Sequence, residues 1–184
     1  AASPAWSHGT PQQRFDLLDA VGSEILARKD EIGRLLSREE GKTLPEGIGE
    51  TVRAAMIFKF FAGEALRCGG EVIPSVRPGV GVEVFRQPLG VIGLIAPWNF
   101  PLAIFTGQVA AALAAGNAVL AKPAEQTPLV AHAAVKLLLE AGVPPGVLHF
   151  LPGDGARIGG VLLKDPRLTG VAFTGSNATA SVIN

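Results

Sequence analysis

A regular alternation of apolar runs and helical segments over residues 89–184 constrains the fold more than any other feature. The first run, Leu89–Ala96, is short, uncharged and rich in β-branched residues, as is typical of a strand buried on both faces. Strands are expected at 89–96, 118–122, 147–151 and 170–174, and helices at 101–115, 128–141, 154–164 and 176–184. Strands that alternate with helices form parallel sheets through right-handed crossovers. The sequence therefore predicts an α/β fold: a Rossmann-like parallel sheet with flanking helices.

Two further segments precede this region, so we expect units at 1–70, 71–88 and 89–184. Residues 1–70 have helical periodicity: a capping box at Thr10-Pro11-Gln12-Gln13 starts one helix, which continues to Gly41, and a second helix follows Pro45. Two sets of charges read as solvent-exposed, namely the helix end Glu39-Glu40 and the face with Arg53, Lys59 and Arg67. Residues 71–88 read as a hairpin arm in which 80–86 alternates like a half-exposed strand, a type of element that often pairs with another chain.

Composition excludes several classes of function. The 184 residues carry 16 Lys and Arg against 16 Asp and Glu, so no net charge attracts nucleic acid or an anionic membrane. The apolar stretches are too interrupted to span a bilayer. A single cysteine, Cys68, rules out an internal disulfide and fits the reducing cytoplasm. The three histidines show no metal-ligand spacing, so no metal site is expected. The low charged fraction, 17%, and the lack of a starting Met or signal peptide suggest a piece of a longer protein.

Polar residues follow the first buried strand in the turn Pro97-Trp98-Asn99-Phe100-Pro101. Ligands of open α/β sheets bind at the carboxyl ends of the strands. An amide there, Asn99, can donate N–H to an oxygen that gains negative charge during a reaction. The alternative is that Asn99 caps the following helix, and that Trp98 is a packing residue.

The second and third strand ends fit a dinucleotide. After the second strand, Lys122 and Glu125 could bind the hydroxyls of an adenosine ribose, and Glu125 would repel a 2′-phosphate, which favours NAD over NADP. A surface ion pair is the alternative. After the third, Gly175 leaves room for a pyrophosphate and Ser176 can cap a helix, with or without a ligand. Residues 153–159 read as a turn and helix start near an adenine ring.

These segments, with Glu40-Gly41-Lys42-Thr43, resemble the NAD(P)-dependent aldehyde dehydrogenase superfamily over essentially the whole chain. The resemblance implies a truncated aldehyde dehydrogenase fold. It also implies a mechanism in which a cysteine attacks an aldehyde, hydride passes to NAD, and water releases the acid. Asn99 would stabilise the oxyanion, and Phe100 would line the aldehyde tunnel. The residues that would contact the cofactor are Ala96, Pro97, Trp98, Lys122, Ala124, Glu125, Gly155, Phe173, Gly175 and Ser176.

The chain departs from the family pattern in two places. The family's nucleophilic cysteine and general-base glutamate follow the Phe-Thr-Gly-Ser motif, where this chain ends, and Cys68 lies in no matching motif, so the chain alone is expected to bind a dinucleotide without oxidising aldehydes. Gln108 stands where many members carry Lys. The alternative is a non-catalytic dinucleotide-binding or assembly module.

The resemblance to subfamilies is divided. Residues 100–182 are similar to the pyrroline-5-carboxylate (glutamate semialdehyde) dehydrogenase module of bacterial proline-utilisation flavoenzymes, and residues 10–88 to 2-oxoglutarate semialdehyde dehydrogenases. Both imply a small semialdehyde substrate and a homo-oligomer formed through residues 71–86 of the full-length protein.

Overall fold

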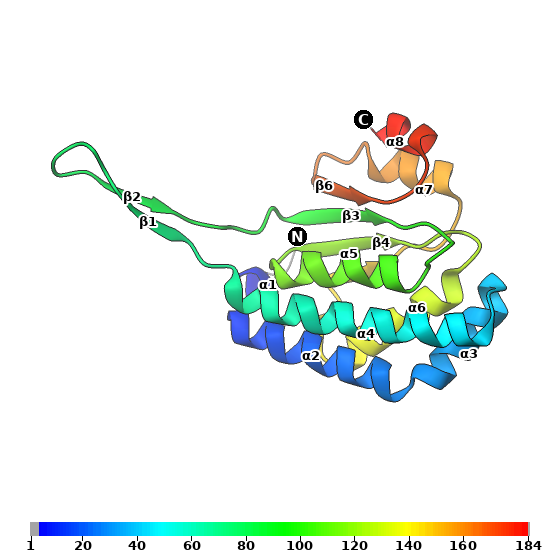
Figure 1. Cartoon of the computed structure of the whole chain (residues 1–184). Coiled ribbons are helices and arrows are strands. Elements are labelled where there is room, and N and C mark those ends of the chain that lie inside the picture. Colours follow the sequence, from blue (N-terminus) through cyan, green and yellow to red (C-terminus); the bar gives the residue numbers. More distant parts are fainter. Residues whose placement is uncertain (1–3, 184) are drawn as a thin grey trace.

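The computed structural model describes residues 4–183, which form a four-stranded parallel sheet, four helices that alternate with or follow its strands, and a layer of N-terminal helices (Figure 1). The elements run in the order α1 (Pro4–Ser7), α2 (Pro11–Ala27), α3 (Lys29–Glu40), α4 (Leu44–Arg67), β1 (Glu71–Pro74), β2 (Gly81–Val84), β3 (Val91–Ile95), α5 (Ala103–Ala114), β4 (Ala118–Lys122), α6 (Pro128–Glu140), β5 (Leu148–Phe150), α7 (Gly155–Leu162), β6 (Leu168–Phe173) and α8 (Asn177–Ile183). The predicted α/β class and the alternation of strands with helices are confirmed.

The order of strands in the sheet is β5-β4-β3-β6, and all neighbours are parallel. Ile95, the last residue of β3, pairs with Lys122 at the end of β4 and with Phe173 at the end of β6. Because the three strands end in register, the loops that follow them leave the sheet at one edge.

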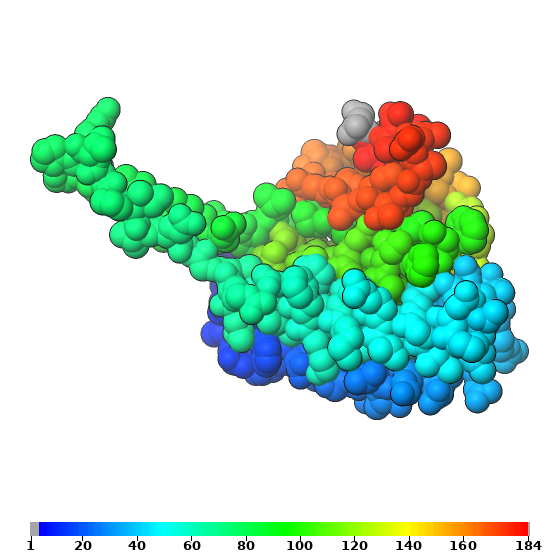
Figure 2. Space-filling view, in the orientation of Figure 1, coloured from blue at the N-terminus to red at the C-terminus, as the bar shows by residue number. Residues whose placement is uncertain are grey.

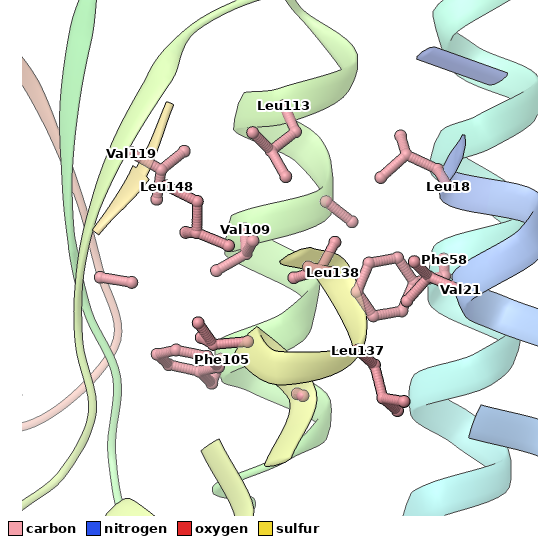
Figure 3. Packing of buried hydrophobic residues seen from close by; sticks show 14 of the residues in the cluster. Leu18, Val21, Phe58, Phe105, Val109, Leu113, Val119, Leu137, Leu138 and Leu148 are labelled. Atoms are coloured by element: carbon pink, nitrogen blue, oxygen red, sulfur yellow. The ribbon is translucent and has the colours of Figure 1, made fainter. Parts of the chain in front are cut away.

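Helices cover both faces of the sheet. Helices α5 and α6 lie on one face and α7 on the other, while α4 and α2 form a further layer outside α5 (Figure 1). In the core between the sheet and these layers, Phe105 and Val109 of α5 lie between Val119 of β4 and Phe58 of α4 (Figure 3). Each of these side chains is fully buried, and burial of one such side chain contributes about 1.5–3 kcal/mol.

The predicted first helix is wrong in one respect, since it breaks at Arg28. Arg28 has φ −100° and ψ 21°, and its N–H donates to the carbonyl oxygens of Glu24 and Leu26. The break redirects the chain, so that α2 packs along α4 while the end of α3 reaches α6. Apolar residues continue at helical spacing through the break, so periodicity alone does not reveal it.

The hairpin β1–β2 projects away from the rest of the molecule (Figures 1 and 2). Every residue of both strands is exposed, so the prediction of a strand with one covered face is wrong for this chain by itself. Among residues 4–183, no helix combines the length and apolar character needed to cross a membrane.

Candidate functional site

The three strand-end loops meet at one edge of the sheet, and backbone hydrogen bonds connect them. The Ala96 N–H donates to the Lys122 carbonyl at 3.2 Å, and the Thr174 N–H donates to the Ile95 carbonyl at 3.1 Å. Residues 96–100, 122–125 and 173–176 therefore follow strand ends that lie at the same edge of the sheet.

Asn99 is exposed in this turn, and within residues 4–183 its side chain has no hydrogen-bond partner. The alternative that Asn99 caps the following helix is wrong, because the N–H groups of Leu102 and Ala103 donate to Glu50 Oε1 at 2.9 and 3.0 Å. The amide is thus available to a ligand. Trp98 is 54% exposed beside it, so Trp98 is not a packing residue.

A buried ion pair, which sequence analysis missed, holds the turn in place. Lys42 Nζ donates to Glu50 Oε2 at 2.5 Å and to the Asn99 carbonyl at 3.1 Å, and it lies 4.6 Å from the centre of the Phe100 ring. Because Glu50 also caps α5, a single carboxylate links α4, the turn and the next helix. In the sequence, residues 40–43 drew notice only through their resemblance to the family, and that resemblance did not predict the contact between Lys42 and Glu50.

The acidic pair at the end of α3 is not solvated as predicted. Both carboxylate oxygens of Glu39 accept hydrogen bonds from the N-terminus of α6, from the Leu129 N–H at 2.6 Å and the Val130 N–H at 2.8 Å. Glu40 accepts from the Lys42 N–H at 3.1 Å. Glu39 therefore joins the end of α3 to the start of α6, whereas Glu40 stabilises the turn that follows α3.

Lys122 is only 4% exposed, and its Nζ donates to the Pro123 carbonyl at 3.0 Å. Burial lowers the pKa of this ammonium, and the negative charges of Glu125 and Asp154 partly oppose the shift. No ion pair joins Lys122 to Glu125 in the described part of the chain, and Lys122 is not at the surface. The alternative of an ordinary surface ion pair is therefore wrong, and the buried cation needs another explanation.

Glu125 connects the second loop to α7. Its carboxylate accepts a hydrogen bond from the Gly155 N–H, and a Cβ at position 155 would lie 3.1 Å from Glu125 Oε1. Asp154 caps the same helix by accepting from the Arg157 N–H at 2.7 Å. The predicted turn and helix start at 153–159 are thus confirmed, and Gly155 allows the two segments to approach closely.

At the third loop, the space beside Gly175 is filled by the Phe173 ring. A Cβ at position 175 would come within 2.6 Å of that ring, so a larger residue would displace it. Ser176 Oγ accepts from the Thr179 N–H at 3.2 Å, which is the capping geometry expected from the sequence. Ala124, in the second loop, is buried.

A groove of about 1050 Å³ runs between α4 and α5 and is lined mainly by apolar residues. Phe100 and Gln108 contribute to its wall, and Gln108 Nε2 donates to Thr174 Oγ1 at 3.1 Å. Another cavity, of about 750 Å³, lies between α7 and the sheet and contains none of the predicted site residues. In the described residues, no three His, Cys, Asp or Glu side chains gather as metal ligands would.

Cys68 is far from this edge. Cys68 follows the last residue of α4, whereas Glu50, which contacts the site edge, lies in the first half of that helix. At the rise per residue of an α-helix, the two residues are about 27 Å apart along the helix axis. Cys68 therefore cannot serve this site as a nucleophile.

Comparisons with known proteins agree on one family. The sequence profile of the aldehyde dehydrogenase family matches residues 1–184. The bifunctional protein PutA of Klebsiella aerogenes is 46% identical over 181 residues, which are 98% of this chain and 13% of that protein. The alpha-ketoglutaric semialdehyde dehydrogenase of Bacillus subtilis is 40% identical over 182 residues, 99% of this chain and 37% of that protein.

A solved structure has the same fold over nearly the whole chain. A betaine aldehyde dehydrogenase of Staphylococcus aureus, crystallised in complex with NAD⁺, has a TM-score of 0.95 and 33% identity to this chain. The match covers 98% of this chain and 36% of the other. The chain therefore spans between 13% and 37% of the length of these three relatives.

Proposed function

This chain belongs to the aldehyde dehydrogenase family, and we propose that its sheet edge forms the NAD-binding and aldehyde-binding part of an enzyme that oxidises a semialdehyde to the carboxylic acid. The observation that carries the proposal is that three loops leave the sheet at one edge, with an exposed Asn99 amide that has no partner in the described chain and a buried ammonium at Lys122. A buried cation with one carbonyl acceptor is costly for stability, and such groups are more frequent at functional sites.

The residues fit a dinucleotide. Lys122 is positioned to donate to ribose hydroxyls, and the charge of Glu125 opposes a 2′-phosphate, which supports NAD rather than NADP. The family uses NAD(P), and the Staphylococcus aureus relative binds NAD⁺. When bound, NAD would accept a hydride from the substrate. The backbone around Ala96, Pro97 and Trp98, together with Ala124, Gly155, Phe173, Gly175 and Ser176, would form the remaining contacts.

Asn99 would act on the aldehyde. Its side-chain N–H would donate to the carbonyl oxygen as that oxygen gains negative charge, and Lys42 and Glu50 hold its backbone in place. Removal of one such donor typically lowers kcat by about 10²–10³-fold. Phe100 would begin the passage for the rest of the substrate, since it lines the groove between α4 and α5.

The names of the relatives support a semialdehyde substrate. One is an alpha-ketoglutaric semialdehyde dehydrogenase, and a 1-pyrroline-5-carboxylate dehydrogenase of Anoxybacillus flavithermus is 42% identical. We propose an aldehyde of the glutamate semialdehyde or 2-oxoglutarate semialdehyde type.

Calorimetric titration of the folded chain with NAD⁺ tests the cofactor part of the proposal. We expect Lys122→Ala and Glu125→Ala to weaken binding, each by about tenfold if one charge-assisted hydrogen bond is lost. Lys136→Ala is the matched control, because Lys136 is an exposed residue of α6 that pairs only with Glu140 in the described chain. Circular dichroism must show that each variant is folded. Equal affinity in the wild type and both site variants, or no binding by a folded wild type, would contradict the proposal.

A further inference from the structure

We infer that Arg53 is an anchor for a carboxylate at the far end of the substrate, so that the groove between α4 and α5 selects short aldehydes that carry an anionic tail. The inference rests on the proposed aldehyde-binding role of the same edge and specifies its substrate class. The charge pattern of the sequence predicts that Arg53 lies on a solvent-exposed face of the helix.

The groove is an apolar channel with one charge. Of the residues that line it, Arg53 is the only charged one, and most of the others are aliphatic or aromatic. Arg53 shares a stripe of α4 with Met56, Ile57 and Phe60, which also line the groove and follow it at helical spacing. Arg53 therefore lines the groove together with these apolar neighbours.

Arg53 lies near the end of the groove that is closest to Asn99. Glu50, three residues before Arg53 on α4, caps the first turn of α5. Ile57, four residues after Arg53, lies opposite Gly107 in the middle of α5. Arg53 is thus about 5 Å along the helix axis from the Glu50 contact. An aldehyde with its carbonyl at Asn99 would need only a short chain to bring a terminal carboxylate to the guanidinium.

The other cation near Phe100 is already engaged. Lys42 is bonded to Glu50 and to the Asn99 carbonyl, and it is also 3.7 Å from Glu40. Within residues 4–183, Arg53 has neither a hydrogen bond nor an ion pair. A carboxylate that enters the groove therefore meets one uncommitted cation.

Gln108 does not compete for this role. Its amide Nε2 already donates to Thr174, and its Oε1, which is buried without a partner, is an acceptor that cannot bind a carboxylate. The groove thus has no second donor of comparable strength among its described side chains. An arginine suits this task because its planar fork donates two parallel hydrogen bonds to one carboxylate.

The probe for this site is glutarate, a five-carbon dicarboxylate, with the neutral diamide glutaramide as its matched control. Titrations would be followed by amide chemical shifts of the isotopically labelled chain. We expect glutarate to shift the signals of groove residues such as Gly107 and Met56. We also expect Arg53→Met to raise its Kd about tenfold, the effect of losing one charge-assisted contact.

Three comparisons make the experiment decisive. Arg53→Lys should restore part of the affinity, since it keeps the charge but not the fork. Arg34→Met should leave the Kd unchanged, because Arg34 is an exposed arginine of α3 outside the groove. Glutaramide should bind more weakly than glutarate and should not respond to Arg53→Met. An equal Kd for glutarate in the wild type and Arg53→Met, or no shift of groove signals in the wild type, would overturn the inference.

NAD⁺ titration of the same samples separates this result from the cofactor proposal. Arg53→Met should bind NAD⁺ like the wild type, because Arg53 lies on α4, away from the loops at Lys122 and Gly175. Arg53-dependent glutarate binding without any NAD⁺ binding would reject the cofactor role and retain the carboxylate anchor. NAD⁺ binding without Arg53-dependent glutarate binding would reject the carboxylate anchor and retain the cofactor role.

Discussion

At the tip of β4, the Lys122 ammonium lies inside the protein with the Pro123 carbonyl as its acceptor, 3.0 Å away. Within the described chain it has no carboxylate in ion-pair contact to offset the loss of hydration. An apolar side chain of similar length would fill the same space without that cost. We therefore expect Lys122 to favour NAD⁺ binding while it lowers the stability of the folded protein.

Lys122→Met should stabilise the free protein and weaken NAD⁺ binding. Burial lowers the pKa of Lys122, so the unfolded state binds more protons than the folded state between the lowered value and 10.5. The wild type should therefore gain stability as the pH rises through that window, and the variant should not. Removal of about 1 kcal/mol of desolvation cost would raise Tm by about 2–4 °C at pH 7. The difference in Tm should shrink towards pH 10, as measured by thermal circular dichroism. A variant that is less stable than the wild type at pH 7 would contradict this explanation.

At the scale of elements, the helices that start at the site edge receive their caps from distant parts of the chain. Glu50 of α4 caps α5, Glu39 of α3 caps α6, and Glu125 of the β4 loop contacts the first N–H of α7. A carboxylate at a helix N-terminus satisfies free N–H groups and interacts favourably with the helix dipole. The N-terminal helices are thus part of the frame that orients the site.

Glu50→Ala should be among the most destabilising substitutions in this frame. The change would leave the Leu102 and Ala103 N–H groups without their acceptor and Lys42 without its closest counter-charge. Loss of one partner of a buried ion pair costs about 3–5 kcal/mol in the free energy of unfolding, measurable by urea titration. Glu64→Ala is the control, since Glu64 pairs with Arg67 at the surface and should cost less than about 1 kcal/mol. Equal losses in the two variants would show that Glu50 does not support α5.

These long-range caps also define what the sequence could predict. Local signals predicted the helix starts at Pro11 and Pro128 correctly, because each helix begins with a proline at its first position, although only the first has a side-chain cap from the threonine before it. The strand-end positions of Asn99, Lys122 and Gly175 followed from alternation and from the rule for parallel sheets. The partners of Glu39 and Glu50 lie 90 and 52 positions away, and no local pattern encodes which helix start a carboxylate will reach.

At the scale of the molecule, the parallel sheet with its helices forms a body that holds the site, and the arm projects from it (Figure 2). The N-terminal layer is joined to this body by buried polar contacts, such as Arg14 Nε donating to the Ala114 carbonyl at 3.0 Å. The arm has no such support. Two-stranded ribbons are marginally stable in isolation, and Val72 and Phe85 are 84% and 72% exposed. Exposed apolar residues on free strand edges favour pairing with another chain.

We therefore propose that residues 71–86 mediate self-association, and we expect the sedimentation coefficient of the wild-type chain to rise with protein concentration. Val72→Lys combined with Phe85→Lys should keep the chain monomeric at the same concentrations, because charged side chains on a strand edge oppose pairing. Leu129→Lys is the matched control: Leu129 is an exposed apolar residue of α6, on the body of the protein, and its replacement should leave association unchanged. Unaltered circular dichroism would show that the double variant is folded, since the arm contributes no buried side chains to the core. Association of the double variant to the same extent as the wild type would assign the contact to another surface, and a strictly monomeric wild type would show that the arm alone does not assemble the protein.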